Sequence, residues 1–166
     1  MRNIIHGKVW KFGDNIDTDV IAPTAYSKLS IDEMKVHVMD RIRPEFARDM
    51  KPGDIVVAGI NFGCGSSREQ APLALKYAGA KCVLAESFAR IFFRNAINIG
   101  LPVIECRGIS AAVETGDELA VDFEAGKIEN VSKGKKFQVD KLPPFIIEIL
   151  VDGVLIENLL RRINKK

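Results

Sequence analysis

The sequence is poor in the side chains that most often mark metal sites and disulfide frameworks. It has three cysteines, two histidines and one tryptophan in 166 residues, and its formal net charge is only +2. The cysteines at positions 64, 82 and 106 are odd in number and widely spaced, which argues against a disulfide framework or a zinc site and favours a reducing cytoplasm. A charge this small does not indicate nucleic acid as the main partner.

Long apolar stretches are also missing. No segment approaches the roughly 18 consecutive apolar residues of a transmembrane helix, and the N-terminal residues lack the apolar core and cleavage site of a signal peptide. The histidines, His6 and His37, are isolated, which favours surface or core positions over metal binding. We expect one soluble domain over residues 1–166 that has neither a membrane nor a nucleic acid as partner.

The middle of the chain alternates short apolar runs with helix-like segments. Strand-like runs at 54–59, 81–85 and 102–105 are almost wholly apolar, and helix-like segments at 67–78 and 88–98 separate them. This alternation predicts a buried parallel sheet with covering helices and right-handed crossovers.

The two ends of the sequence add strands of another kind. Residues 4–12 are typical of a strand, and 118–139 contain three short strand-like runs around turns. Those three runs predict a β-meander. The expected fold is therefore α/β, with a parallel-sheet core and a small β-meander.

Two further helices are expected outside the middle of the chain. Apolar residues spaced by three and four predict an amphipathic helix over 30–42, with Ser30 as its N-cap. A final helix is expected from Pro143 to about Ile163, and Gly153 is expected to interrupt or bend it.

A run of nine residues, Asn-Phe-Gly-Cys-Gly-Ser-Ser-Arg-Glu at 61–69, joins an expected strand to an expected helix. Ligands gather at such junctions in α/β sheets, because the helix N-terminus offers free N–H groups to an anion. An arginine is unfavourable in a first helical turn unless a bound anion shares the space. Its planar fork also matches a carboxylate with two hydrogen bonds. We expect a site for a small carboxylate or phosphate, built from Ser66, Ser67 and Arg68.

Other interpretations of the same run stay open. Ser66 and Glu69 have the spacing of a capping box, which would make the serine a helix cap with or without a ligand. An activated Ser66 alkoxide could instead take a proton from a carbon next to a carboxylate, although serine is an uncommon general base. A hydrolase triad is unsupported because no histidine lies nearby in the sequence, and the run lacks the Gly-Lys-Ser/Thr ending of a P-loop.

An acidic cluster, Asp14, Asp17 and Asp19, precedes this run. Taken alone, it favours a turn with solvated carboxylates. The functional alternative is that Asp19 orients a hydroxyl or a cation across a cleft. The aspartates are weak evidence for a metal because no further ligands accompany them.

The helix-like segment 88–98 follows Ser87, which we expect to be its N-cap. The segment places Arg90 and Arg94 on one helix face. These arginines could support the loop at 63–68, meet a partner chain or lie in solvent.

Three motifs occur in order, at 13–21, 61–71 and 87–102. Together they resemble the small subunit of 3-isopropylmalate dehydratase in the aconitase superfamily, of the archaeal and anaerobe type. The resemblance runs from Gly7 to about Leu160. It implies a swivelling β/β/α domain that closes over a large subunit. That partner would carry a [4Fe–4S] cluster with its cysteine ligands, so that this chain would bind no cofactor itself.

The resemblance also implies roles for individual residues. Ser66 matches the catalytic base, Ser67 and Arg68 match the residues that bind the substrate carboxylate, and Asp19 matches an aspartate close to the catalytic serine. The implied reaction is the isomerisation of 2-isopropylmalate to 3-isopropylmalate by dehydration and rehydration, in leucine biosynthesis.

The loop after Pro23 departs from the family pattern. Relatives often have Tyr-Leu-Arg or a similar run there, which sets the choice of substrate, whereas this chain has Tyr-Ser-Lys-Leu at 26–29. Lys28 could replace the arginine as a looser point-charge contact to substrate, or have no substrate role. Isopropylmalate, homocitrate or homoaconitate, citramalate and dimethylmalate therefore stay open as substrates. A carboxylate-binding module without turnover is the alternative from another class.

Overall fold

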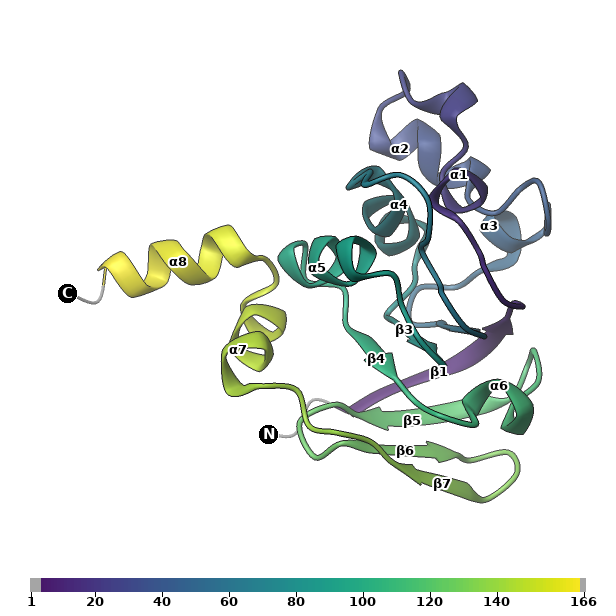
Figure 1. The fold of residues 1–166 in the computed structure, drawn as a ribbon, viewed down its shortest axis with the longest axis vertical. Coiled ribbons are helices and arrows are strands. Elements are labelled where there is room, and N and C mark those ends of the chain that lie inside the picture. The colour runs from purple at the N-terminus through teal and green to yellow at the C-terminus, as the bar shows by residue number, and fades with distance from the viewer. Residues whose placement is uncertain (1–3, 165–166) are drawn as a thin grey trace.

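The computed structural model describes residues 4–164 and contains one curled, seven-stranded sheet (Figure 1). The strand order is β4-β3-β2-β1-β5-β6-β7, so the first strand of the chain lies in the middle of the sheet. The sheet is parallel on one side of this strand and antiparallel on the other.

The parallel half consists of β1 (Ile4–Lys11), β2 (Ile55–Ala58), β3 (Cys82–Ala85) and β4 (Val103–Glu105). Every residue of β2 and β3 is buried, because other elements cover both faces of the sheet there. Continuous apolar runs of this kind are typical of buried parallel strands. The predicted parallel core is confirmed.

The antiparallel half consists of β5 (Glu118–Asp122), β6 (Lys127–Asn130) and β7 (Lys135–Gln138). The strands follow one another as a meander, as predicted. The meander joins the same sheet through β1. Residues 4–8 of that strand pair with β5, and residues 9–11 pair with β2.

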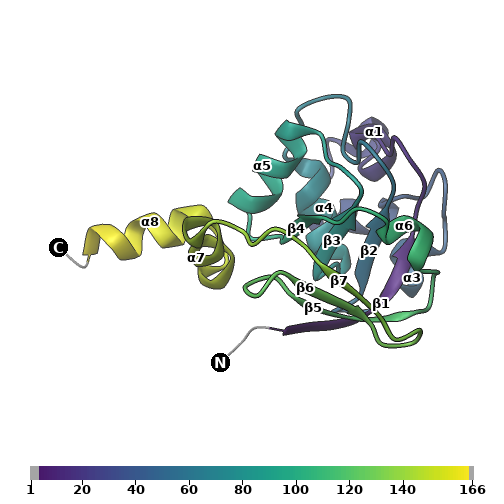
Figure 2. The same ribbon diagram turned by 60° about the horizontal axis from the view of Figure 1, so that its bottom comes forward.

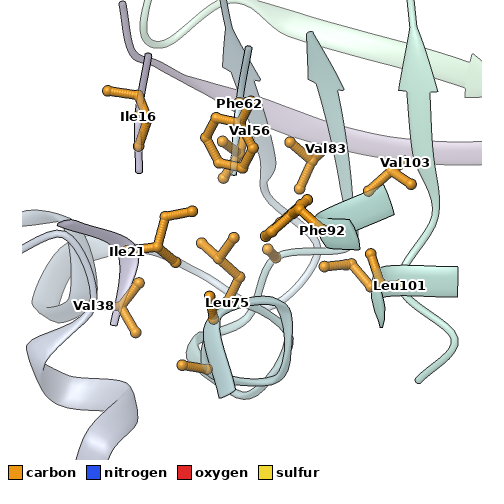
Figure 3. Packing of buried hydrophobic residues seen from close by; sticks show 14 of the residues in the cluster. Ile16, Ile21, Val38, Val56, Phe62, Leu75, Val83, Phe92, Leu101 and Val103 are labelled. Atoms are coloured by element: carbon orange, nitrogen blue, oxygen red, sulfur yellow. The ribbon is translucent and has the colours of Figure 1, made fainter. Parts of the chain in front are cut away.

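The helices lie around this sheet (Figures 1 and 2). A buried cluster on one face of the parallel strands includes residues of α4 and α5, as Figure 3 shows. A second cluster on the other face joins the parallel strands to β5, β6 and α6. In chain order the helices and 3-10 turns are α1 (Thr18–Ile21), η1 (Thr24–Tyr26), α2 (Ile31–Met34), η2 (Lys35–His37), α3 (Phe46–Asp49), α4 (Gln70–Ala78), α5 (Arg90–Asn98), α6 (Ile109–Ala112), α7 (Pro144–Asp152) and α8 (Leu155–Asn164).

The predicted helix over 30–42 is much shorter in the structure. Ser30 caps it as expected and forms a capping box with Glu33, but the α-helix ends at Met34. A 3-10 turn follows, and Met39 has a φ of +61°, which is incompatible with a continuing helix. Met39 is fully buried, so tertiary packing of its side chain outweighs the local helical pattern.

The predicted final helix is two helices. Gly153 separates α7 from α8 with a φ of +96°, as its expected role as a breaker requires. Figures 1 and 2 show α8 extending away from the body, on the side opposite α1 to α3. Among residues 4–164, every helix falls short of the length and apolar character that a membrane crossing needs.

Candidate active site

The loop after β2 is held against two other segments by its backbone. Gly63 donates its N–H to the Ile16 carbonyl at 2.7 Å, and the Cys64 carbonyl accepts the N–H of Thr18 at 2.8 Å. On the other side, Phe62 forms an isolated bridge with Phe88. These bonds bring the acidic cluster of the N-terminal region beside the serine and arginine motif.

Glycine is required at position 63 for two reasons. Its φ is +80°, a conformation that side chains disfavour. A Cβ there would also overlap the buried ring of Phe92 on α5. Gly65 has a φ of +95° and lies against Thr18, so the two glycines let the loop turn closely around α1 and α5.

Ser66 is exposed at the tip of this loop and is not a helix cap. The predicted capping box is wrong, because α4 begins at Gln70 and its N-cap residue, Glu69, makes no side-chain cap. The hydroxyl of Ser66 instead lies 3.2 Å from Oγ1 of Thr18, and that Oγ1 also donates to the Ser66 carbonyl at 3.1 Å. Thr18 is only 3% exposed, so a buried hydroxyl fixes the orientation of this serine.

Arg68 connects the serine to the acidic cluster. Its Nε donates to the Ser66 Oγ at 3.0 Å, and its Nη2 lies 3.4 Å from Oδ1 of Asp19. A guanidinium beside a hydroxyl oxygen stabilises the alkoxide form of that hydroxyl. The structure therefore brings together Ser66, Arg68 and Asp19, as the sequence analysis predicted.

Asp19 is an ionised carboxylate that holds cations and a loop. It accepts hydrogen bonds from the hydroxyl and the N–H of Thr24, and it pairs with Arg41 as well as Arg68. The bonds from Thr24, together with that from Arg41, hold the pKa of Asp19 well below its usual range. A carboxylate so weakly basic is suited to orienting Arg68 and not to accepting a proton at neutral pH.

The other two aspartates have structural roles that the interpretation as a solvated turn did not include. Asp17 is the N-cap of α1 and accepts the Val20 N–H at 2.8 Å. Asp14 accepts the Ile60 N–H at 2.8 Å and so fixes the start of the site loop.

The two remaining candidates lie at the edge of this arrangement. Ser67 is exposed, and its carbonyl accepts from Nδ2 of Asn95 at 3.4 Å. Lys28 is exposed on the loop after η1, and within residues 4–164 its amine has no ion pair or hydrogen bond. Nε2 of Gln70 donates to the Ser27 carbonyl at 3.3 Å, so the Lys28 loop touches the first turn of α4.

Two residues of the site, Thr18 and Arg41, were not predicted from the sequence, and Ser87 joins Ser66 as an expected cap that caps no helix. Thr18 lies between two aspartates, and only its burial reveals that it orients Ser66. Arg41 gave no signal because its partner Asp19 is 22 residues away. Ser87 is not the N-cap of α5; that residue is Ala89, while the Ser87 hydroxyl accepts the Asn61 N–H at 2.8 Å.

The cysteines do not fit an iron–sulfur cluster held by this chain. Cys82 and Cys106 are buried on the face of the sheet that packs against the meander. Burial raises the pKa of Cys82 to about 12 and that of Cys106 to about 11. Cluster ligands are thiolates, which such environments disfavour. Within the described part of the chain, no group of three His, Cys, Asp or Glu side chains is placed to hold a metal ion.

A curled α/β sheet that presents two hydroxyls and a clamped arginine beyond a strand end defines a swivel-type α/β domain. Residues 14–108 match the aconitase C-terminal domain family. The chain belongs to this family, within the small subunits of the 3-isopropylmalate dehydratase type, which are parts of hydro-lyases.

Close relatives cover nearly the whole chain. The isopropylmalate/citramalate isomerase small subunit of Methanocaldococcus jannaschii is 55% identical over 98% of this chain and 97% of its own length. The methanogen homoaconitase small subunit of Methanothermobacter thermautotrophicus is 51% identical over 99% and 95%. A crystal structure of 3-isopropylmalate dehydratase from Methanocaldococcus jannaschii superposes with a TM-score of 0.90, at 43% identity over 96% of this chain and 95% of that one.

Proposed function

We propose that this chain is the small subunit of an enzyme that interconverts 2-isopropylmalate and 3-isopropylmalate by removing and re-adding water. The observation that carries the proposal is the contact between Arg68 Nε and Ser66 Oγ, with Asp19 behind the guanidinium. Relatives named for 3-isopropylmalate dehydratase support the choice of substrate and a role in leucine biosynthesis.

Ser66 acts as the general base in this proposal. Its alkoxide takes the proton from the carbon next to a substrate carboxylate, and the electrons of that C–H bond form the new double bond as the hydroxide leaves. Arg68 stabilises the alkoxide, and the buried hydroxyl of Thr18 holds the oxygen in place. Rehydration at the neighbouring carbon reverses these steps, with Ser66 returning the proton.

Arg68 and Ser67 bind the substrate carboxylate. The guanidinium bonds Ser66 and Asp19 through Nε and Nη2, which leaves its Nη1 for a ligand oxygen. The exposed hydroxyl of Ser67 is a second donor at the same edge. Asp19 fixes the guanidinium plane, so the orientation of Arg68 does not depend on the substrate.

The departure of the substrate hydroxyl is assigned to a large subunit. In this proposal that partner holds a [4Fe–4S] cluster, and the two chains work together in the cytoplasm. The burial of Cys82 and Cys106 supports placing the cluster on the partner.

Homoaconitate is the second candidate substrate. Lys28 is an exposed cation on a loop that touches α4, and one relative is named a methanogen homoaconitase small subunit. A substrate with an additional carboxylate would gain a charge contact there. The ring of Tyr26, at the end of η1, is stacked on His37, whereas Leu29 in the loop is exposed and instead offers apolar surface to an isopropyl group.

Anaerobic co-expression with candidate large subunits, followed by assays on a panel of substituted malates, tests the proposal. We expect turnover, with the highest kcat/KM for isopropylmalate. The matched control is Val131→Glu, an exposed change on the meander, which leaves turnover unchanged. Carboxylate binding without turnover in every combination would support the non-catalytic module instead.

A further inference from the structure

The carboxylate of Asp19 divides its two oxygens between different partners. Oδ1 accepts the backbone N–H of Thr24 at 2.8 Å and the hydroxyl of the same residue, and Nη2 of Arg68 lies 3.4 Å from this oxygen. Oδ2 instead accepts from Nη1 of Arg41. One oxygen therefore serves the arginine beside Ser66, and the other serves an arginine with no contact to that serine.

The two guanidinium groups compete for this carboxylate. The terminal torsion of an aspartate is broad, so its carboxylate rotates easily unless other donors fix it. A guanidinium binds a carboxylate best when it contacts both oxygens through two parallel hydrogen bonds. Arg41 makes the shorter of the two contacts and already holds one oxygen. Without further donors, the carboxylate would turn its second oxygen to Arg41 as well, and Arg68 would lose its partner.

Thr24 supplies the donors that oppose this rotation. Both its N–H and its hydroxyl donate to Oδ1, the oxygen that Arg68 also contacts. These two bonds are the main reason that the pKa of Asp19 lies well below its usual range, so the carboxylate stays ionised at neutral pH. Thr24 itself is exposed at the start of η1 and is not part of the hydrophobic core. Packing in the core therefore does not explain a hydroxyl at this position.

We propose that Thr24 is a positioning residue that keeps Oδ1 of Asp19 directed at Arg68. The inference rests on the proposed function, in which Arg68 binds the substrate carboxylate and stabilises the alkoxide of Ser66. While Asp19 holds Nη2 of this arginine, its Nε stays on the Ser66 Oγ at 3.0 Å. Thr24 contacts no substrate atom in this arrangement and acts only through Asp19.

Two substitutions separate the hydroxyl from the rest of the Thr24 side chain. Thr24→Val removes the hydroxyl but keeps the shape of the side chain and the backbone N–H, whereas Thr24→Ser keeps the hydroxyl. In the enzyme assembled with its large subunit, Thr24→Val should lower kcat/KM at least about tenfold, which is the size expected for one hydrogen bond to a charged group. Thr24→Ser should retain most of the wild-type value.

Thr115→Val is the matched control for this loss. It makes the same chemical change at an exposed threonine before β5, whose hydroxyl accepts from the Lys11 N–H at 3.0 Å and from Arg43 at 3.2 Å. It should leave kcat/KM unchanged. A wild-type kcat/KM in Thr24→Val, or an equal loss in Thr24→Ser, would overturn the positioning role.

Thr24 also begins the segment that carries Lys28, so an effect on that segment has to be distinguished from an effect on Arg68. In the proposed function Arg68 binds a carboxylate that all substituted malates share. Thr24→Val should therefore lower kcat/KM by the same factor for isopropylmalate and for homoaconitate. A change in the ratio of the two values would assign Thr24 to substrate choice through the Lys28 segment and would overturn the inference.

A second substitution tests the competition with Arg41. Arg41→Met removes the competing guanidinium, so a chain with both Thr24→Val and Arg41→Met should have a higher kcat/KM than one with Thr24→Val alone. Two independent structural defects would instead add their losses. An additive or larger loss in the double variant would contradict the proposed rotation of Asp19 toward Arg41.

The nuclear magnetic resonance signal of the Arg68 Nε–H gives a readout that does not need turnover. It is recorded on the full chain with isotopically labelled arginine, and Arg68→Lys identifies it. The Nε–H should exchange with water several-fold faster in Thr24→Val than in the wild type or in Thr24→Ser. Equal exchange rates in all three would overturn the positioning role and leave the proposed function intact. Faster exchange in Thr24→Val, with a wild-type enzyme inactive on every substituted malate, would support the positioning role and contradict the proposed function alone.

Discussion

At the scale of single residues, Ser66 has contacts that separate catalysis from folding. Its hydroxyl contacts Thr18 and Arg68 but caps no helix. Removing a helix cap usually lowers the free energy of unfolding by about 1 kcal/mol. Ser66 is exposed and caps no helix, so we do not expect this loss when it is replaced. A change at this position should therefore alter the chemistry with little effect on stability.

Ser66→Ala should lower kcat of the assembled enzyme by about 10²-fold or more, which is the usual size of general-base catalysis. Substrate affinity should change little, because the base acts on the barrier and the carboxylate contacts of Arg68 and Ser67 remain. Steady-state kinetics and substrate binding by calorimetry measure the two effects, and urea unfolding of the isolated chain serves as the control. Near-normal turnover would show that the serine is not the base.

Lys28→Arg should shift the ratio of kcat/KM toward the more acidic substrates. An arginine offers a carboxylate two parallel hydrogen bonds, whereas lysine is a point charge on a flexible stem. The measurement is kcat/KM for isopropylmalate and homoaconitate in both proteins at one ionic strength. An unchanged ratio would assign specificity to another part of the enzyme, the large subunit first.

Residue types predicted much of the site but not its inner contacts. Ser66 and Arg68 could be recognised because an arginine and hydroxyls at a strand–helix junction require an explanation. Asp19 was linked to them by the family resemblance, since its acidic cluster taken alone favoured a solvated turn. Arg41 could not be recognised, because its pairing with Asp19 depends on how the segment after α2 turns back. That turn includes Met39, whose positive φ is imposed by burial and is not encoded in local propensity.

At the scale of elements, packing between the site loop and α5 fixes the position of the hydroxyls. The Gly63→Ala variant should lower the free energy of unfolding on the order of 2 kcal/mol, through overlap with Phe92 and an unfavourable φ. It should also reduce turnover, since the loop must move away from α5. Gly13→Ala is the matched control, because a Cβ there meets nothing within 4 Å. Urea titration gives the free energy of unfolding of both variants. Equal values would show that the loop accommodates the added Cβ without strain.

Element types were predictable, whereas helix starts were not. Strands β2, β3 and β4 follow from their apolar runs and α4 and α5 from the alternation between them, as predicted. The start of α4 was predicted too early because the hydroxyl of Ser66, an apparent cap, contacts Thr18 and not the helix N-terminus. In the same way, the hydroxyl of Ser87, the apparent cap of α5, accepts the Asn61 N–H and not an N–H of the helix. Tertiary hydrogen bonds to a side chain compete with capping, and the sequence does not reveal them.

At the scale of the whole molecule, the isolated chain should fold and yet have no turnover. Anaerobic treatment with iron and sulfide should give neither cluster absorbance nor product, since Cys82 and Cys106 remain buried, protonated thiols far above neutral pH. Robust turnover by the lone chain would contradict the two-subunit proposal.

Alkylation of the native chain provides an independent check on the thiols. At a pH near 8, iodoacetamide should modify Cys64, which is partly exposed, well before Cys82 and Cys106. The raised pKa values mean that the reactive thiolates of the buried pair form only as the pH approaches about 11 to 12 or the chain unfolds. Mass spectrometry in buffer and in urea distinguishes the positions.

The divided pairing of β1 has a consequence for the order in which the molecule is completed during synthesis. Residues 9–11 can pair with β2 as soon as β2 has left the ribosome. Residues 4–8 can pair only after β5 has been synthesised. Throughout the translation of the intervening parallel half, this segment is an open strand edge, which is a template for association with other chains. If translation stopped between β4 and β5, the parallel half of the sheet could be complete. Residues 4–8 would still lack the strand with which they pair.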